Sequence, residues 1–390
     1  MNFINISNFP YDKIYVLLSK GYRRNLINNS IKILKLKNYY GLSKWINNIC
    51  KTKFNGGDIK YWIDGKKLDN RTGKIHPKFM PLYLVIKLAE LNKEKIESLH
   101  NNLLSYRSGG SGLIISPAIL PIKVTPELDS IVTHLFGDGA AGDFTPSYTQ
   151  KHREAVDNFI KKLENCFGQF EKSIYLTQGK YQVKFPKAIT DILSEYYSIV
   201  SYKSHESKMP IQILNRKDKK FKLACIISFI VDEGNIRDVI SLYSVNKELL
   251  SNIRQMSINC DYNCSEIRYN NKANSYLFTL STKDIERLYQ DIQNLSKEFP
   301  TCNLSFKDEA IKFIINRRTK KNPKNSSVTK KAVFNALKKG KFSALEISRA
   351  TGYAYCTIIH CLEQLLKENK VKRNMIENKT YLWESTEFNK

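Results

Sequence analysis

Two acidic residues stand at matching positions behind two apolar runs. The runs span residues 131–136 and 226–231, and the acids Asp138 and Glu233 each lie two residues beyond their run, 95 residues apart (233 − 138). Carboxylate oxygens are hard ligands that suit Mg²⁺, and two acids that share a cation site suit in-line attack on a phosphodiester. The residue types therefore indicate metal-assisted phosphoryl chemistry where two helices end.

The segments that follow the two acids repeat each other. A tyrosine lies nine residues after the glycine of each motif, at Tyr148 and at Tyr243, and a polar residue and a lysine come shortly after it. A helix headed by a lysine follows 49 residues after the first acid, at Lys187, and 50 after the second, at Lys283. Between them, each copy has two extended segments joined by a polar turn, at residues 172–177 with 180–185 and at 266–269 with 276–280. We therefore expect a duplicated unit of helix, strands, helix, strands and helix.

The two apolar runs must be buried, and in a repeated unit the natural partner of each helix is its own copy. Close packing of two helices requires small residues at the contact, and Thr133, Ser228 and Gly137 occupy suitable positions. Two carboxylates at adjacent helix C-termini repel each other, so the pair predicts a divalent cation. Either motif alone could be an ordinary helix stop, since Asp-Gly and Glu-Gly are common turn dipeptides. Their common register on a basic chain favours the functional interpretation.

The motifs Phe136-Gly137-Asp138-Gly139 and Val231-Asp232-Glu233-Gly234 resemble those of single-chain LAGLIDADG homing endonucleases. The resemblance covers roughly residues 126–318. It implies an α/β (α+β) fold with two pseudo-symmetric halves, residues 126–215 and 216–318, whose antiparallel sheets form a saddle over DNA. It also implies that Asp138 and Glu233 hold Mg²⁺ or Mn²⁺, with Gly137 and Asp232 beside them.

The same resemblance implies one lysine from each half near the metal-bound water, for which Lys208 and Lys297 are the candidates. Such a lysine would stabilise developing negative charge, although either could be an ordinary surface lysine. The chain departs from the family pattern in having Thr133 and Ser228 where glycine is preferred. His134 is unusual in an apolar helix, and we expect it to pack or to face solvent near the domain edge rather than bind metal.

Alternation along the predicted strands gives a DNA-contacting face. Lys180, Gln182 and Lys184 point to one side of their strand, and residues 181, 183 and 185 point to the other. Lysine and glutamine side chains can contact phosphates and base edges. The same face would include Ser173, Tyr175 and Thr177 in the first half and Arg268 and Thr279 in the second. A solvated sheet face has the same pattern, so this alternative stays open.

The formal net charge is +26, from 63 Lys+Arg against 37 Asp+Glu. A charge excess of this size repels itself in a compact protein and favours a polyanionic partner, here double-stranded DNA or intron RNA. Codon bias in an A+T-rich genome would supply lysine but would not remove acids. No run approaches the roughly 20 apolar residues of a membrane span. The first ten residues lack a signal-peptide pattern, so we expect a cytoplasmic protein.

The remaining segments predict accessory modules. Residues 1–107 are mostly helical in pattern, and residues 38–66 weakly resemble a repressor-type helix-turn-helix. Residues 108–125 read as a linker, and a basic linker at 319–328 leads to a winged helix-turn-helix at 329–390. In that module Tyr355 and Thr357 open the expected recognition helix. Helix-turn-helix units also mediate protein contacts, which is the alternative role. Eight scattered cysteines complete no zinc-binding pattern.

These patterns predict a monomeric, site-specific, metal-dependent double-strand DNA endonuclease of the homing type. Two alternatives use the same basic surface. One is a transcriptional regulator with a retired nuclease fold, which the WhiA family resembles, and the other is an RNA maturase that helps an intron fold. Retention of both acids argues against the regulator and bears less on the maturase. An intein is not expected, because neither Met1-Asn2 nor Asn389-Lys390 offers splicing residues.

Overall fold

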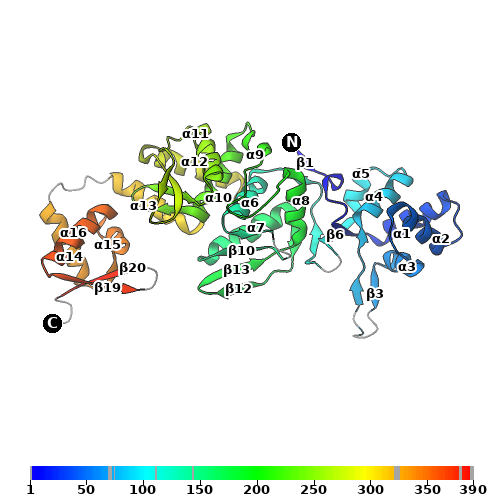
Figure 1. Ribbon diagram of the computed structural model, residues 1–390, viewed down its shortest axis with the longest axis horizontal. Coiled ribbons are helices and arrows are strands. Elements are labelled where there is room, and N and C mark those ends of the chain that lie inside the picture. Colours follow the sequence, from blue (N-terminus) through cyan, green and yellow to red (C-terminus); the bar gives the residue numbers. More distant parts are fainter. Residues whose placement is uncertain are drawn as a thin grey trace.

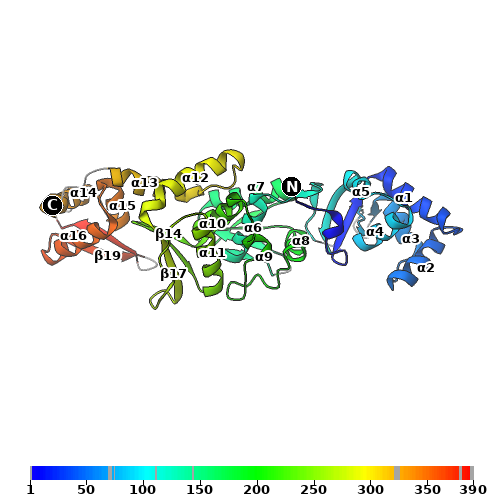
Figure 2. The same cartoon turned by 90° about the horizontal axis from the view of Figure 1, so that it is seen from above.

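The computed structural model describes residues 2–68, 73, 75–109, 112–142, 145–319, 326–376 and 380–386. An N-terminal domain, a central pair of helix-and-sheet units and a small C-terminal domain lie in a row along the long axis (Figures 1 and 2). The described chain mixes helices with antiparallel sheets, in agreement with the α+β class expected from the sequence. Within these ranges no helix has the length and apolar character needed to cross a membrane.

Two apolar helices, α6 (Pro126–Gly137) and α10 (Lys219–Glu233), pack against each other at the centre of the molecule. The Thr125 side chain caps α6 by accepting a hydrogen bond from the Leu128 amide, and a proline at the first helical position favours the start. Every residue of α6 up to Phe136 is buried, as are residues 223–231 of α10. A helix that is apolar around its whole circumference is stable only inside a core, which explains this placement.

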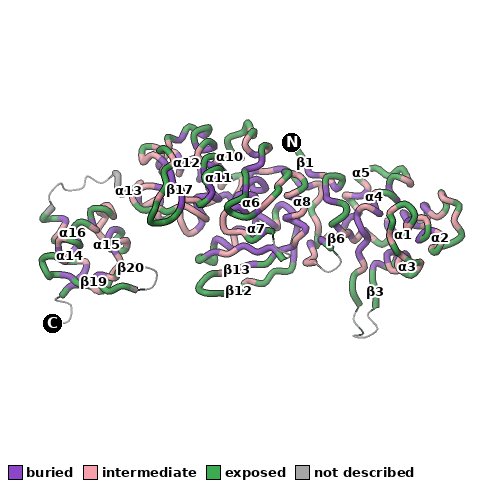
Figure 3. The backbone as a smooth tube through the Cα atoms, in the orientation of Figure 1, coloured by how far each residue is buried: buried purple, intermediate pink, exposed green. Residues whose placement is uncertain are grey.

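The helices are in close contact near their C-terminal ends. A Cβ atom added to Gly137 would lie 3.0 Å from the Cβ of Asp232, so a side chain there would have to push Asp232 aside. Thr133 and Ser228 are both buried. The close approach expected at Gly137 is therefore confirmed, and both motif acids are carried to the seam between the helices. Figure 3 shows the seam helices as largely buried, while the turn of the outer hairpin near β12 is exposed.

Each of the two helices starts a unit with the same order of elements. The first unit continues with β9 (Gly139–Ala140), β10 (Ser147–Gln150), α7 (Arg153–Phe167), β12 (Ile174–Thr177), β13 (Lys180–Lys184) and α8 (Lys187–Tyr197). The second continues with β14 (Gly234–Ile236), β15 (Ile240–Ser244), α11 (Lys247–Asn259), β16 (Arg268–Asn270), β17 (Ser275–Leu280) and α12 (Ile285–Glu298). The sheets have the orders β12-β13-β10-β9 and β16-β17-β15-β14. Both predicted hairpins are present, and the first turns at Gln178 and Gly179 with positive φ angles of 50° and 72°.

The register of the sheets shows that Tyr148 and Tyr243, which match in sequence spacing, do not occupy equivalent positions. Tyr148 pairs with Gly139 across β9 and β10, whereas Leu242, not Tyr243, pairs with Gly234 across β14 and β15. The connection in the second unit is one residue shorter. Because successive strand residues point to opposite faces, this single residue turns Tyr148 into the core and Tyr243 away from it.

The N-terminal domain contains more strand than its sequence pattern predicts. Its helices are α1 (Lys20–Ile33), α2 (Tyr39–Cys50), α3 (Gly56–Asp64), α4 (Leu82–Leu91) and α5 (Ile96–Asn102), with a short 3₁₀ helix, η1 (Ile6–Asn8). Its strands are β1 (Phe3–Ile4), β2 (Ile14–Leu18), the hairpin β3 (Lys66–Leu68) and β4 (Ile75–Pro77), β5 (Met80–Pro81) and β6 (Leu103–Ser108). The segment expected to resemble a helix-turn-helix thus holds α2 and α3.

The segment at 108–125 is not a simple linker, which corrects the sequence-based boundary. It contains β7 (Ile115–Ala118) and β8 (Ile122–Lys123), whose isoleucines are fully buried. β7 joins a sheet of order β11-β7-β6-β2-β5, in which β11 (Gly168–Phe170) belongs to the first central unit. β8 pairs with β1 at the start of the chain. Ile115, Ile122 and Val124, which lie near Pro117 and Pro121, belong to the shared core and fix this segment to it.

The C-terminal domain has a hydrophobic core of its own. After α9 (Ile211–Leu214), η2 (Thr282–Asp284), η3 (Ser305–Lys307) and α13 (Asp308–Thr319) in the central part, the chain enters α14 (Ser326–Leu337), α15 (Ala344–Thr351) and α16 (Tyr355–Lys367). A sheet of order β18-β20-β19 completes it, from β18 (Phe342–Ser343), β19 (Val371–Ile376) and β20 (Thr380–Ser385). Ser343 with Glu346 three residues on is the sequence spacing of a capping box, and Gly352 predicts a helix end; the structure confirms both, with Gly352 in the left-handed conformation. Most of the predicted 319–328 linker lies outside the described residues.

The tight seam can be tested by enlarging Gly137. We expect Gly137→Val to destabilise the metal-free protein by about 1–3 kcal/mol, because the new side chain must displace Asp232 from a packed interface. The measurement is urea unfolding followed by tryptophan fluorescence. Gly142→Val is the matched control, since a Cβ there meets no atom within 4 Å. Equal stability of the two variants would contradict the close packing.

Candidate active site

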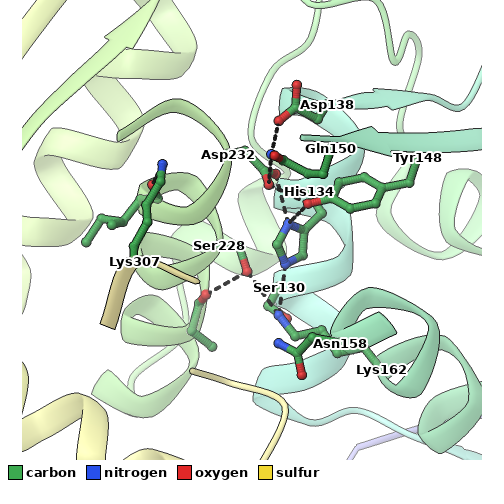
Figure 4. A network of polar contacts seen from close by, with 12 residues as sticks. Ser130, His134, Asp138, Tyr148, Gln150, Asn158, Lys162, Ser228, Asp232 and Lys307 are labelled. Carbon is green, nitrogen blue, oxygen red and sulfur yellow. Dashed lines mark hydrogen bonds and ion pairs between the residues drawn. The ribbon is translucent and has the colours of Figure 1, made fainter. Parts of the chain in front are cut away.

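Three carboxyl groups gather where α6 and α10 end. Asp138 follows the last residue of α6, and Asp232 and Glu233 close α10. The Gln150 side-chain amide, at the end of β10, donates hydrogen bonds to Asp138 and, at 3.4 Å, to Asp232 Oδ1. Figure 4 shows Gln150 between the two aspartates. The sequence predicted Asp138 and Glu233 at one seam with Asp232 beside them, and the structure brings these residues together.

Burial disfavours ionisation of all three groups, and repulsion by neighbouring carboxylates adds to it for Asp138 and Glu233. Burial, together with the charges of Asp232 and Glu233 and against the opposing lysines 180 and 307, raises the pKa of Asp138 to about 8. Burial likewise raises the pKa of Asp232 to about 7, and burial together with Asp232 raises the pKa of Glu233 to about 7. At neutral pH the cluster therefore retains protons that a divalent cation would displace.

Lys307 is the lysine that lies against this cluster. Its Nζ donates hydrogen bonds of 2.6 Å to the carbonyl oxygens of Ile230 and Gly234, at the C-terminal end of α10. Burial lowers the pKa of Lys307 to about 8, although the three carboxylates raise it. An ammonium has three donors, so one N–H remains beyond the two carbonyl bonds. Lys307 is the last residue of η3. No sequence motif distinguishes it from the other lysines of the chain.

The two lysines predicted from the family resemblance lie elsewhere, which is a correction. Lys208 is exposed and pairs with Glu248 at 3.1 Å. Lys297, in the last turn of α12, is also exposed and donates to Asn294 at 3.2 Å. The resemblance did not identify the lysine at the seam, because η3, which carries Lys307, reaches the acids only through tertiary packing.

His134 is buried rather than solvent-facing, and it connects Asp232 to a buried lysine. Its Nδ1 lies 2.8 Å from Asp232 Oδ2, and its Nε2 lies 2.9 Å from Lys162 Nζ on α7. These partners require the neutral tautomer in which Nδ1–H donates to the carboxylate and Nε2 accepts from the ammonium. Burial, followed by the charge of Lys162, lowers the pKa of His134 well below its usual value, in agreement with a neutral ring. Tyr148 also donates to Asp232, at 2.6 Å.

The residues expected to contact DNA in the first unit lie on one side of its sheet. Lys180 and Lys184 are exposed at the two ends of β13, while Val183 between them is buried. Gln182 donates to the Ser147 hydroxyl at 3.1 Å on the neighbouring strand, and Lys184 Nζ lies 5.7 Å from the ring centre of Tyr175. This alternation agrees with the predicted face.

The other expected DNA contacts fall in the second unit and the C-terminal domain. Arg268 is exposed and pairs with Leu277, on the same face as the half-buried Thr279. Thr357 is exposed near the start of α16. The amide of Tyr355, the first residue of α16, donates to Asp238 from the β14–β15 turn at 2.9 Å.

The donor chemistry of the cluster suits a hard divalent cation, but it does not form a complete ligand set. Among the described residues, no group of three or more His, Cys, Asp or Glu side chains is arranged to hold a metal ion. Asp138 and Glu233 would each supply a carboxylate oxygen, and the remaining ligands would come from water and a substrate phosphate. Raised carboxyl pKa values in a buried cluster are the feature of this structure that fits a cation.

Comparison with known proteins gives partial structural similarity and no sequence match. No family model and no curated protein matches this chain. The crystal structure of I-DmoI in complex with DNA and Mn aligns with 14% identity and a TM-score of 0.33, over 44% of this chain and 97% of that one. A structure of a mesophilic variant of the homing endonuclease I-DmoI aligns with 13% identity and a TM-score of 0.33, over 42% of this chain and 89% of that one. Full-length DUF199/WhiA from Thermatoga maritima aligns with 12% identity and a TM-score of 0.34, over 64% and 93%.

The raised carboxyl pKa values give a pH dependence of stability. A carboxyl group whose pKa is raised in the folded state leaves the fold stable at low pH, and the unfolding free energy falls as pH rises from the unfolded pKa of roughly 4 to the folded pKa of about 7–8, above which it levels off. We expect Asp138→Asn to flatten this fall between about pH 5 and pH 8 by up to about 1.4 kcal/mol per pH unit, the effect of one proton. Urea unfolding in EDTA measures this slope.

The exposed Asp157 on α7 supplies the control. Asp157→Asn removes a surface carboxylate that pairs with Arg153 at 3.5 Å, and it should leave the slope unchanged. Added Mg²⁺ should stabilise the wild-type protein more at pH 8 than at pH 6, because the cation competes with protons for the carboxylates. An Asp138→Asn slope identical to wild type would contradict the buried, repulsive cluster.

Proposed function

We propose that this protein is a site-specific double-strand DNA endonuclease that hydrolyses phosphodiester bonds with Mg²⁺ or Mn²⁺. The observation that carries the proposal is the cluster of Asp138, Asp232 and Glu233 at the seam of two repeated units in a chain of net charge +26. Buried acids that repel one another cost stability, and a cation site is the function that accounts for them. One acid from each unit at a common seam suits two cuts, one in each strand.

In this proposal each residue of the cluster has a distinct role. Asp138 and Glu233 would hold the cations, which would neutralise phosphate charge and favour attack by water. Gln150 fixes the orientation of Asp138 through its amide. Lys307, anchored by two carbonyl oxygens, keeps one N–H free to stabilise negative charge on a phosphate. Its lowered pKa, about 8, also allows it to exchange a proton near neutral pH.

The sheet faces and the terminal modules would bind the DNA on either side of the cut. Lys180, Gln182, Lys184 and Tyr175 offer charge, hydrogen bonds and a ring on one sheet, and Arg268 and Thr279 continue on the other. Beside the first sheet, a cleft of about 920 Å³ reaches the N-terminal domain and is lined by residues that include Lys13, Tyr175 and Lys184. The lining sets three lysines, Lys13, Lys184 and Lys187, against three acids, Asp12, Glu171 and Asp191, so the proposed DNA contact rests on the sheet face rather than on the cleft.

The terminal modules add basic charge at both ends. Residues 1–107 contain 20 Lys+Arg and 7 Asp+Glu, a balance of +13 (20 − 7), which is half of the net charge of the chain. We propose that α2 and α3 with the β3–β4 hairpin, and α14–α16 with the β19–β20 hairpin as a winged helix-turn-helix, extend the DNA contacts. Tyr355 and Thr357 would make those of the C-terminal module. The protein would act as a monomer, since both acids come from one chain. We propose that it acts in the cytoplasm.

Cleavage of DNA that flanks the gene tests the proposal. We expect the wild-type protein to cut one site in both strands with Mg²⁺, and Asp138→Asn or Glu233→Gln to reduce the rate by at least about 10³-fold, because each removes a metal ligand from a site that depends on few. Denaturing gels of end-labelled duplexes measure the rate. Asp261→Asn is the control, because this exposed acid pairs with Lys219 away from the seam.

The outcomes separate the three functions. Specific binding of duplex DNA without cleavage by the wild-type protein would contradict the endonuclease and support a regulator. Acceleration of intron splicing in vitro, unaffected by Asp138→Asn, would support a maturase. Retention of both acids at a packed seam is the reason that the endonuclease is preferred to either.

The sheet face can be tested separately by its salt dependence. We expect the double variant Lys180→Ala/Lys184→Ala to bind duplex DNA more weakly and to reduce the slope of log Kd against log salt concentration by roughly 1–2, because each phosphate contact contributes about 0.9. Fluorescence anisotropy across salt concentrations measures this slope. Lys161→Ala, at an exposed position on α7 behind the sheet, is the matched control. A slope equal to wild type for the double variant would exclude this face.

A further inference from the structure

We infer that the C-terminal domain is held in a closed state, in which Asp238 blocks the start of α16, and that a DNA phosphate must displace this carboxylate before the domain binds a duplex. The inference rests on the DNA-binding part of the proposed function, which gives the start of α16 its role. Asp238 lies in the turn between β14 and β15 of the second central unit. The C-terminal domain lies beside that unit in both views (Figures 1 and 2).

The contact is made through two backbone amides in the first turn of α16. The Tyr355 amide donates to Asp238 Oδ1 at 2.9 Å, and the Cys356 amide donates to Asp238 Oδ2 at 3.1 Å. The first amides of a helix have no partner inside the helix, and the positive end of the helix dipole attracts anions. Both oxygens of one carboxylate therefore occupy the place that a phosphate takes when it binds at the start of a helix.

The sequence of α16 leaves these amides to an acceptor from outside the helix. Its N-cap is Ala354, which has no polar side chain and makes no capping hydrogen bond. Serine, threonine, aspartate and asparagine are preferred at this position because their side chains accept from such amides. The preceding helix, α15, closes its own start with the capping box of Ser343 and Glu346. Of these two helices, only α16 thus receives its cap from another part of the chain.

A second contact covers the side chain of Tyr355. The guanidinium of Arg237, which precedes Asp238 in the turn, lies 4.7 Å from the centre of the Tyr355 ring in a cation–π arrangement. Base contacts of a recognition helix usually originate from its first residues, and Tyr355 and Thr357 are the residues proposed above for this role. A duplex that approached them would meet the negative charge of Asp238. The turn and a duplex therefore compete for the start of α16.

The closed state can open because little else supports it. Among the described residues, the C-terminal domain shares neither a sheet nor a hydrophobic core with the second unit. Arg237 is exposed and Asp238 is half-buried, and charged contacts at such positions are weak in water. A duplex offers a row of phosphates for the amides of α16, and opening would also free the Arg237 guanidinium to pair with one of them.

Binding of duplex DNA by the full-length protein in EDTA tests the inference without cleavage. The probe is a fluorescein-labelled duplex of random sequence, about 30 base pairs or three helical turns long. Asp238→Ala should lower the Kd, measured by fluorescence anisotropy, roughly 10-fold, the effect of opening a state that is closed about nine-tenths of the time. Asp238→Asn keeps the size of the side chain and removes its charge. It should lower the Kd by a smaller factor, and it serves if Asp238→Ala does not fold.

Two controls separate opening of the domain from a general change of charge. Glu266→Ala removes an exposed acid of the same unit, which pairs with Arg254, and should change the Kd by less than about 2-fold. Thr357→Glu places a negative charge on the exposed start of α16 and should repel DNA there. In a Thr357→Glu background, Asp238→Ala should therefore also change the Kd by less than about 2-fold.

Amide hydrogen exchange reports the closed state in the absence of DNA. The amides of Tyr355 and Cys356 should exchange roughly 10-fold faster in Asp238→Ala than in the wild-type protein, because both lose their acceptor. The start of α15, which is capped within the domain, should exchange at the same rate in both proteins. Mass spectrometry of peptic peptides that cover the two helix starts measures these rates.

The outcomes distinguish this inference from the proposed function. Failure of both the wild-type protein and Asp238→Ala to bind the duplex would overturn both. An unchanged or raised Kd for Asp238→Ala, or a gain of the same size in Glu266→Ala or in the Thr357→Glu background, would overturn the inference and leave the endonuclease standing. Equal exchange at the start of α16 in the two proteins would also overturn it. The expected gain in a protein that cuts no DNA would support the closed state and contradict the proposed cleavage.

Discussion

The packing of α6 against α10 is the contact on which the rest of the structure depends. Both helices are buried along most of their length, so each depends on the other to cover it, and Gly137 allows their ends to meet. The same packing places three acids in a poorly solvated seam. The free energy gained by burying the two helices offsets the cost of holding those carboxyl groups together. The stability of the fold and the placement of the three acids therefore depend on the same interface, as is common for functional sites.

Local patterns in the sequence predicted the elements of this seam well. Apolar runs, the hairpin turns and the capping box at Ser343 depend on a few neighbouring residues, and each is present in the structure. The prediction that Asp138 and Glu233 meet required only the repeat and the burial of its helices. These features could be predicted because each follows from periodicity or from one side-chain hydrogen bond.

Features that depend on tertiary register could not be predicted in the same way. Lys307 reaches the acids from a short helix 74 residues after Glu233 (307 − 233), and nothing near it in the sequence marks it. A connection shorter by one residue separates Tyr148 from Tyr243, although their spacing in sequence looks identical. The sequence left open whether His134 packs or faces solvent, and it could not identify Lys162, on another helix, as its partner. A histidine inside an apolar helix was visible in the sequence, but its contacts with Asp232 and Lys162 could be identified only from the structure.

The two terminal domains differ in how they are attached to the central units. The C-terminal domain encloses a separate core, so its removal leaves the apolar surface of the remainder covered. The N-terminal domain shares both its core and a sheet with the first unit through β7 and β11. A fragment that begins at α6 would leave β11 with an unpaired edge, which invites aggregation. In evolutionary terms, the C-terminal domain can be exchanged between proteins as a unit, whereas the N-terminal domain must change together with the units that it supports.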